Sequence, residues 1–296
     1  MNALAGSGLP PAEVLVERLF KRISEISSLP AVAVRIIEIA NDSKTGAEDL
    51  LEAVQFDTAM AARIMRTVNS SYYSMQNKVA DLKLAITLLG FKEIRNLAVT
   101  AYIAQLFKGS AGHGKYTRAG LWNHMIGVAS VAKLIAETCR KAPPREAYLA
   151  GLLHDLGLIL MDQYLHKPFC EVVDTLTEDA SVCQIEQEVL GFHHAELGAF
   201  VTSRWNLPEQ LSTAIRWHHQ PEEYEGEHRE MVYVVSLANF FCNLKHLSSL
   251  GTPSMRMPPS RVITGLGLQK PQVAGIWEQL DDVLRTADIA ELAQAG

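Results

Sequence analysis

The second half of the chain carries histidine and aspartate residues whose order and spacing could form one metal-binding pocket. Neutral imidazole and carboxylate groups bind Zn, Mn or Fe ions, and a bound ion can activate water for attack on a phosphoester. We take His154 and Asp155 as the candidate catalytic residues. The candidate metal ligands are His124, His154, Asp155, His194, His218, His219 and Asn239.

The apolar residues around these candidates predict which side chains turn towards the core. His124 falls between Leu121 and Met125, inside a stripe with helical spacing. The run His-Ala-Glu-Leu-Gly favours His194 over His193 as the inward residue. His154 belongs to a stripe of mostly small residues, which would let neighbouring helices approach closely: Ala147, Ala150, Gly151, Gly157 and Met161.

From the sequence alone, two explanations remain open for a set of histidines and an aspartate that converge. Each histidine taken alone is explained as a core or helix-end imidazole that makes one hydrogen bond. Burying several imidazoles and a carboxylate without partners would cost roughly a few kcal/mol apiece, so a shared ligand or polar network is expected. That network either holds a divalent metal (Fe, Mn or Zn) or consists of hydrogen bonds alone, with no metal cofactor.

Composition restricts the class of protein. With 296 residues, 48% hydrophobic and 20% charged, the chain can bury a sizeable core. A net charge of −6 gives no global positive field, so we do not expect a nucleic-acid partner. The start lacks the pattern of a secretory signal, and the most apolar segment, 148–161, is too short to span a bilayer. Together with four scattered cysteines, this favours a cytoplasmic protein without membrane contact.

Helical stripes with recognisable starts and stops predict an all-α fold. A glycine-rich break at 109–114 suggests three parts: an N-terminal helical subdomain (1–109), a second helical subdomain (115–246), and a loop with a C-terminal helix (247–296). Among the start signals are a capping box from Thr45 to Glu48 and caps at Asp57 and Asp81. The expected helices cover about 30–40, 49–56, 58–68, 82–89, 92–107, 117–141, 145–165, 182–190, 195–205, 208–218, 229–245 and 271–293.

The sequence around the candidate ligands resembles the HDOD family. The resemblance extends over about residues 23–247. The family's N-terminal signature is matched by Leu29-Pro30, Arg63, Asn69-Ser70 and the segment 85–90. The C-terminal motifs are Trp122-x-His124, Ala150-Gly-Leu-Leu-His154-Asp155-Leu-Gly157, His194-Ala-Glu-Leu-Gly198, Trp205-x-Leu207-Pro208 and His218-His219-x-Pro221. HDOD proteins are helical bacterial signal-transduction modules related to the HD metal-dependent phosphohydrolases. The resemblance implies an N-terminal helical bundle packed on a C-terminal HD-like helical domain.

Differences from the related HD-GYP phosphodiesterases indicate whether catalytic activity is expected. The lysine that follows their His-Asp-x-Gly motif is Leu158 here, and the glutamate before their first histidine is Gly120. Asn239 stands where the HD pattern closes with an aspartate, and it supplies no negative charge. We therefore expect a non-catalytic or degenerate signalling module, whose pocket takes a metal or a small nucleotide-like ligand and which contacts a signalling partner. The alternatives are a metal-dependent phosphohydrolase acting on a nucleotide or cyclic dinucleotide, and an interaction scaffold.

Overall fold

The computed structural model describes residues 12–70, 77–108, 112–178, 180–253 and 257–286, and nearly all of its regular structure is helical. The first six helices are α1 (Ala12–Ile26), α2 (Ala31–Asn41), α3 (Ala47–Val54), α4 (Thr58–Val68), α5 (Leu82–Leu89) and α6 (Phe91–Leu106). A hairpin of β1 (Gly112–His113) and β2 (Tyr116–Thr117) follows, and within the described ranges it is the only sheet. The prediction of an all-α fold is confirmed.

Ten further helices form the second part of the molecule. They are α7 (Arg118–Cys139), α8 (Pro144–Leu153), α9 (Leu156–Tyr164), α10 (His166–Thr175), α11 (Val182–Leu190), α12 (His194–Ser203), α13 (Glu209–Trp217), α14 (Arg229–Leu244), α15 (Ser260–Gly265) and α16 (Lys270–Thr286). The sequence did not predict α1, α10 or α15. Among the described helices, none has both the length and the apolar character needed to cross a membrane.

Polar side chains begin several helices where the sequence predicted them. Asp57 Oδ1 accepts a hydrogen bond from the backbone N–H of Met60 at 2.9 Å, and Asp81 does the same for Leu84. The expected capping box from Thr45 to Glu48 is wrong by one residue. The Thr45 hydroxyl instead donates to the Ile39 carbonyl at the end of α2, and Asp49 accepts from the N–H of Gly46.

The single helix expected over 145–165 is two helices, and the break falls at the candidate catalytic pair. His154 follows α8, and Asp155, at φ −104° and ψ 16°, leaves the helical conformation before α9. Adjacent residues on a continuous helix point about 100° apart. The break therefore lets both side chains turn to one point.

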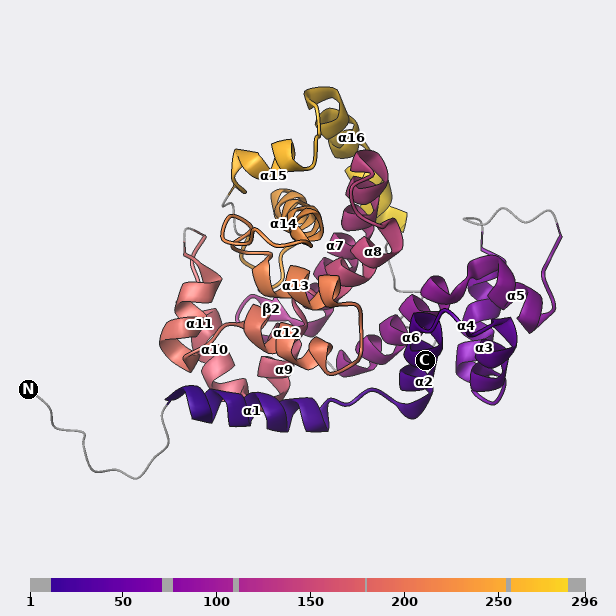
Figure 1. The fold of residues 1–296 in the computed structure, drawn as a ribbon. Helices are drawn as coiled ribbons and strands as arrows, with labels where there is room; N and C mark the ends of the chain where they lie inside the picture. The colour runs from indigo at the N-terminus through magenta and orange to yellow at the C-terminus, as the bar shows by residue number, and fades with distance from the viewer. Residues whose placement is uncertain (1–11, 71–76, 109–111, 179, 254–256, 287–296) are drawn as a thin grey trace, which may run out of the picture.

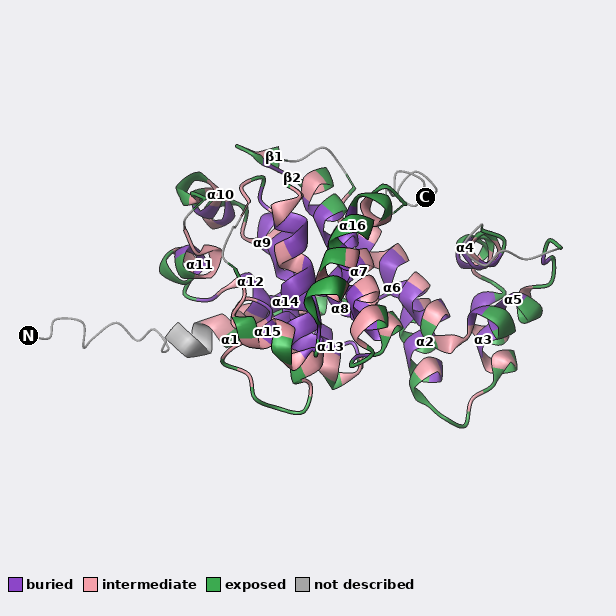
Figure 2. Cartoon of the chain, turned by 90° about the horizontal axis from the view of Figure 1, so that it is seen from above, coloured by how far each residue is buried: buried purple, intermediate pink, exposed green. Residues whose placement is uncertain are grey.

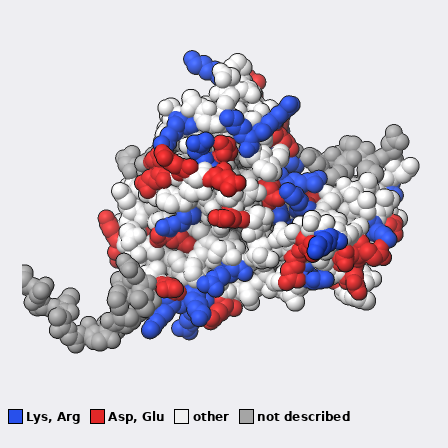
Figure 3. Space-filling view, viewed as in Figure 1, with Lys and Arg blue, Asp and Glu red and all other residues white. Residues whose placement is uncertain are grey.

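The N-terminal bundle, α2 to α6, packs against the HD-like body built around α7 to α14 (Figure 1). In each of the central helices α7, α8, α9 and α14, more than half of the residues are buried (Figure 2). Helix α1 lies along this second body and contacts α12, where Phe20 meets the rings of Phe192 and Phe200 at 4.8 and 5.5 Å. Basic and acidic side chains are interspersed over the face shown in Figure 3.

A buried ion pair joins the bundle to the body, between α6 and α8. Arg95 is 1% exposed, and its Nη2 lies 2.5 Å from Glu146 Oε2. Lys92 also contacts this carboxylate, at 3.1 Å, and Asn96 donates to the Arg145 carbonyl at 2.7 Å. Polar contacts between particular residues thus join the bundle to the body, in addition to apolar packing.

Candidate metal centre

The candidate ligands lie on five helix ends or faces that meet at one buried point. His124 comes from the middle of α7, and His154 and Asp155 from the α8–α9 break. His194 is the first residue of α12, while His218 and His219 follow α13. His124, His154 and His194 are fully buried, and Asp155 and His218 are each 2% exposed. The structure therefore brings six of the seven predicted residues together.

The two carboxylate oxygens of Asp155 face different histidines. Asp155 Oδ2 lies 3.1 Å from His154 Nε2 and 3.5 Å from His124 Nε2. On the other side, Oδ1 lies 3.2 Å from His194 Nε2 and 3.6 Å from His218 Nε2. His219 Nε2 completes this second group, 3.1 Å from His194 Nε2. Asp155 is thus shared by two sets of ligand atoms, each compact enough to hold a metal ion.

The hydrogen bonds on the far side of three rings set which nitrogen carries the proton. His124 Nδ1 faces the Leu247 carbonyl at 2.7 Å, His154 Nδ1 that of Gly151 at 2.7 Å, and His218 Nδ1 that of Ile215 at 2.8 Å. A carbonyl only accepts, so each Nδ1 must donate, and in a neutral ring Nε2 is left with a lone pair. When the three rings are neutral, three lone pairs therefore point at the Asp155 carboxylate.

This arrangement leaves acceptors facing acceptors. His124 Nε2 and His154 Nε2 are 3.2 Å apart, and two lone pairs at that distance cannot hydrogen-bond. His218 Nε2 is buried without a hydrogen-bond partner in the described part of the chain. A cation between these atoms would satisfy them all, so the donor set fits a divalent metal.

The electrostatic environment keeps most of the cluster in the metal-binding form. Burial lowers the pKa of His124 and of His218 to about 4, so both rings are neutral at pH 7. Burial would raise the pKa of Asp155, but the neighbouring histidines, His154 first, hold it well below its ordinary value. Burial likewise opposes the charge on His194, yet the carboxylates of Glu186 and Asp155 raise its pKa to about 10.

Glycines allow the helices that carry these ligands to touch. A Cβ on Gly157 would lie 2.0 Å from the carbonyl oxygen of His194, and one on Gly151 would lie 2.8 Å from Cα of Ala129. Neither position can carry a side chain without moving a backbone. The close approach predicted from the stripe of small residues is therefore observed between α8 and α7 and between α9 and α12.

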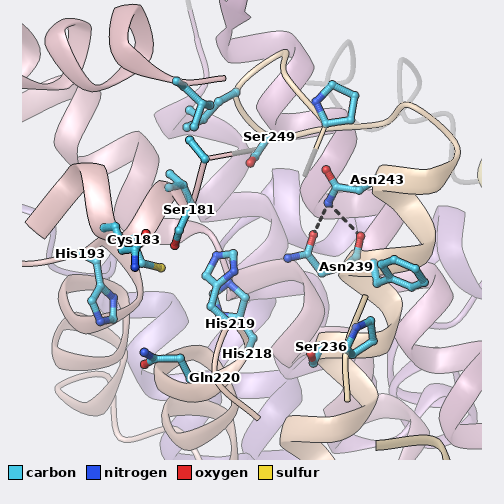
Figure 4. Close-up of a pocket in the computed structure, with 18 of the residues that line it drawn as sticks. Ser181, Cys183, His193, His218, His219, Gln220, Ser236, Asn239, Asn243 and Ser249 are labelled. Carbon is cyan, nitrogen blue, oxygen red and sulfur yellow. Dashed lines mark hydrogen bonds between the residues drawn. The ribbon is translucent and has the colours of Figure 1, made fainter. Parts of the chain in front are cut away.

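A polar cavity of about 720 Å³ opens beside the cluster, and His218 and His219 lie in its wall (Figure 4). Asn239 also lines it, and its Oδ1 accepts a hydrogen bond from Asn243 Nδ2 at 2.8 Å. This contact directs the amide along α14, and a ligand role for Asn239 stays a prediction. His193 lines the cavity too, with 14% of its side chain exposed, so His194 is the inward residue of the pair, as predicted.

One buried residue that contacts the candidate ligands, Glu186, is not among those predicted from the sequence. Glu186 of α11 is fully buried, and its carboxylate accepts from both His194 Nδ1 and the His194 backbone N–H. A signal was present, because Glu186 falls in the inward stripe with Val182, Ile185 and Val189. A charged residue in such a stripe indicates a buried partner.

A comparison with family models shows the family of the chain. The model described as HDOD domain matches residues 26–221, which is about two thirds of the chain. The protein therefore belongs to the HDOD family.

Individual relatives agree with this assignment. An HDOD domain protein with unknown function from Geobacter sulfurreducens is 27% identical, with a TM-score of 0.72 over 92% of this chain and 98% of that one. A Marinobacter aquaeolei VT8 structure, named as a candidate signal transduction protein, is 23% identical with a TM-score of 0.75, over 96% of this chain and 65% of that one.

Curated relatives are longer than this chain. An uncharacterized protein of Treponema pallidum (strain Nichols) is 26% identical over 231 residues, which are 76% of this chain and 44% of that protein. YuxH, an uncharacterized protein of Bacillus subtilis (strain 168), is 26% identical over 125 residues, 42% of this chain and 28% of that protein. The chain thus spans less than half the length of either relative.

Proposed function

We propose that this HDOD protein is a bacterial signal-transduction module whose His/Asp centre binds a divalent metal and does not turn over a phosphoester. The observation that carries the proposal is the set of inward-facing Nε2 atoms around Asp155, in three of whose rings Nδ1 donates to a backbone carbonyl and leaves Nε2 to face the carboxylate. Uncompensated, this arrangement would be strongly unfavourable in a buried site.

Imidazole nitrogens with one shared carboxylate suit Fe, Mn or Zn. The residues that would hold the ion are His124, His154, Asp155, His194, His218 and His219. When bound, a metal of this kind lowers the pKa of a coordinated water and polarises a phosphate oxygen. The protein's own contribution is to keep His124 and His218 neutral, to fix the orientation of the imidazoles and to bury them.

The surroundings favour binding over phosphoester turnover. Leu158, one turn beyond the centre, is 1% exposed and apolar, where a lysine in the related phosphodiesterases supplies positive charge. The described residues that line the cavity include Glu178, Glu196 and Glu222 but no lysine or arginine. Among these described residues, an anionic substrate would find no cation other than the metal.

The cavity size supports a small ligand as the signal, because pockets of about 300–1,000 Å³ accommodate such molecules. A signalling partner is part of the proposal, supported by the family and by the name of the Marinobacter structure. We place the protein in the cytoplasm.

The second candidate is a metal-dependent phosphohydrolase acting on a nucleotide or cyclic dinucleotide. The observation in its favour is Asp155, whose two oxygens face two ligand sets, as in bridged two-metal sites. A Shewanella amazonensis SB2B structure is named as a candidate metal-dependent phosphohydrolase, but at 18% identity it shares only the fold.

Turnover assays separate the two candidates. Protein reconstituted with Fe, Mn or Zn is incubated with cyclic dinucleotides, nucleotides and bis(p-nitrophenyl) phosphate, next to a His154→Ala variant. We expect both proteins to give the same background rate. Hydrolysis by the wild type that exceeds the variant by about 100-fold or more, the contribution expected of a catalytic group, would establish the phosphohydrolase instead.

A further inference from the structure

We propose that Glu186 is the positioning residue of the metal centre: its carboxylate holds His194 with Nδ1 protonated and Nε2 turned to Asp155. The inference rests on the proposed metal site and goes beyond it, because it assigns a role to a residue outside the ligand set. Glu186 belongs to α11, which contributes no ligand to the six-residue cluster around Asp155.

Three contacts join the Glu186 carboxylate to one residue. Glu186 Oε2 lies 2.7 Å from His194 Nδ1 and 3.0 Å from the His194 backbone nitrogen, and Oε1 lies 3.0 Å from Nδ1. A carboxylate accepts at every one of these contacts, so Nδ1–H donates to it. The two anchor points, ring and backbone, fix both the tautomer and the orientation of the imidazole.

His194 differs in this respect from the other three buried histidines. His124, His154 and His218 donate Nδ1–H to backbone carbonyls, whereas His194 alone among them donates to a carboxylate. A carboxylate behind a ligating imidazole makes the ring a stronger donor to metal. We therefore expect His194 to be the strongest imidazole ligand of the centre.

The same carboxylate also balances charge. Glu186 and Asp155 lie on opposite sides of the His194 ring, and both are buried. When a metal takes the place of the Nε2 proton of His194, the two buried carboxylates carry a charge of −2, which one divalent cation neutralises. Glu186 also lies at the N-terminus of α12, where the helix dipole favours an anion.

The alternative is that Glu186 is itself a ligand. Cys183, Glu186 and His194 offer ligand atoms within 4.8 Å of one another, so a metal could sit on the outer side of the His194 ring. The two arrangements differ in the element bound to the ion. The outer site includes sulfur, while the Asp155 site contains only nitrogen and oxygen.

The test is metal affinity in Glu186→Gln, which keeps an accepting oxygen but removes the charge. We expect the metal dissociation constant to rise about 10-fold, and about 100-fold in Glu186→Ala, which removes both. Glu188→Gln, an exposed residue on the same helix, is the matched control and should bind metal like the wild type. Far-UV circular dichroism of each metal-free protein reports whether the fold is intact.

Two measurements on the unsubstituted protein keep the proposal testable if Glu186→Gln does not fold. In the metal-free protein, ¹⁵N NMR should show His194 Nδ1 protonated and hydrogen-bonded. X-ray absorption of the metal-loaded protein should show nitrogen and oxygen neighbours only. Sulfur in the first shell, or a folded Glu186→Gln with wild-type affinity, would overturn the proposal. Failure of the wild type to bind any metal would instead reject the metal-binding function and leave the NMR result to decide the tautomer.

Discussion

At the scale of single residues, the decisive feature is which nitrogen each histidine turns inward. In His124, His154 and His218, Nδ1–H donates to a backbone carbonyl. In the neutral rings the Nε2 atoms that surround Asp155 are therefore acceptors. Hydrogen bonding alone does not account for such a set. The metal-free network considered from the sequence would need a proton on one of the two facing nitrogens, His124 Nε2 or His154 Nε2, whereas a bound cation satisfies both.

Replacing Asp155 by asparagine tests this residue-scale argument. Asp155→Asn removes the only carboxylate that both ligand sets share, and with it the negative charge that attracts the ion. We expect the metal affinity to fall by at least about 100-fold, the order of loss seen when even a supporting partner is removed. Isothermal titration after dialysis measures it.

The control for Asp155→Asn is His228→Ala. His228 lies outside the cluster, before α14, and makes no side-chain cap there. Wild-type metal content in this control together with retained metal in Asp155→Asn would show that Asp155 is not a ligand.

The sequence predicted the convergence of these residues better than it predicted their hydrogen-bond partners. Helical stripes identify the inward face of a helix and predict that His124 and His154 turn to the core, where both are buried, whereas His194 was favoured by the run His-Ala-Glu-Leu-Gly. One partner of Nδ1, the Leu247 carbonyl, lies 123 residues beyond His124, whereas Gly151 and Ile215 lie three residues before His154 and His218. Local periodicity carries no information on the contact with Leu247.

At the scale of elements, the centre depends on close helix contact rather than on large side chains. The backbone of α9 at Gly157 lies against the carbonyl of His194 at the start of α12. The α8–α9 break was not predicted, because the apolar pattern continues through it and only the tertiary demand on Asp155 interrupts the helix.

Gly157→Ala should therefore destabilise the protein although alanine is the better helix former. The added Cβ would collide with the His194 carbonyl, and forced repacking of this kind costs about 2 kcal/mol. For a protein of this size we expect the melting temperature to fall by about 5 °C. Thermal unfolding followed by circular dichroism checks the shift.

Gly275→Ala is the matched control, because a Cβ at Gly275 in α16 meets nothing within 4 Å. It should stabilise the protein by up to about 1 kcal/mol through helix propensity. An equal response of both variants would mean that α9 and α12 are not in close contact.

At the scale of the whole molecule, the N-terminal bundle and the HD-like body are joined by a buried charge pair. The sequence predicted both parts, but not this link, since Arg95 and Glu146 are 51 residues apart and each fits its own helix pattern. The expected boundary near residues 109–115 stays a prediction. Helix α1, at the start of the first segment, contacts α12 of the second.

Glu146→Gln should weaken this junction. It leaves Arg95 buried without its counter-charge, and breaking a buried pair in this way costs about 3 kcal/mol. The surface pair Arg35–Glu38 supplies the control, and Glu38→Gln should change stability by less than about 1 kcal/mol. Chemical denaturation of both variants gives the two values, and equal values would show that the Arg95–Glu146 pair does not hold the parts together.

The most direct test of the account is anomalous diffraction from crystals of protein purified without chelator, combined with elemental analysis of the same preparation. We predict at least one equivalent of Fe, Mn or Zn per chain, with an anomalous peak between Asp155 and the Nε2 atoms of its surrounding histidines. Crystals grown with excess of these metals that show no peak at Asp155, and in which His124 Nε2 and His154 Nε2 still lie in contact, would contradict it.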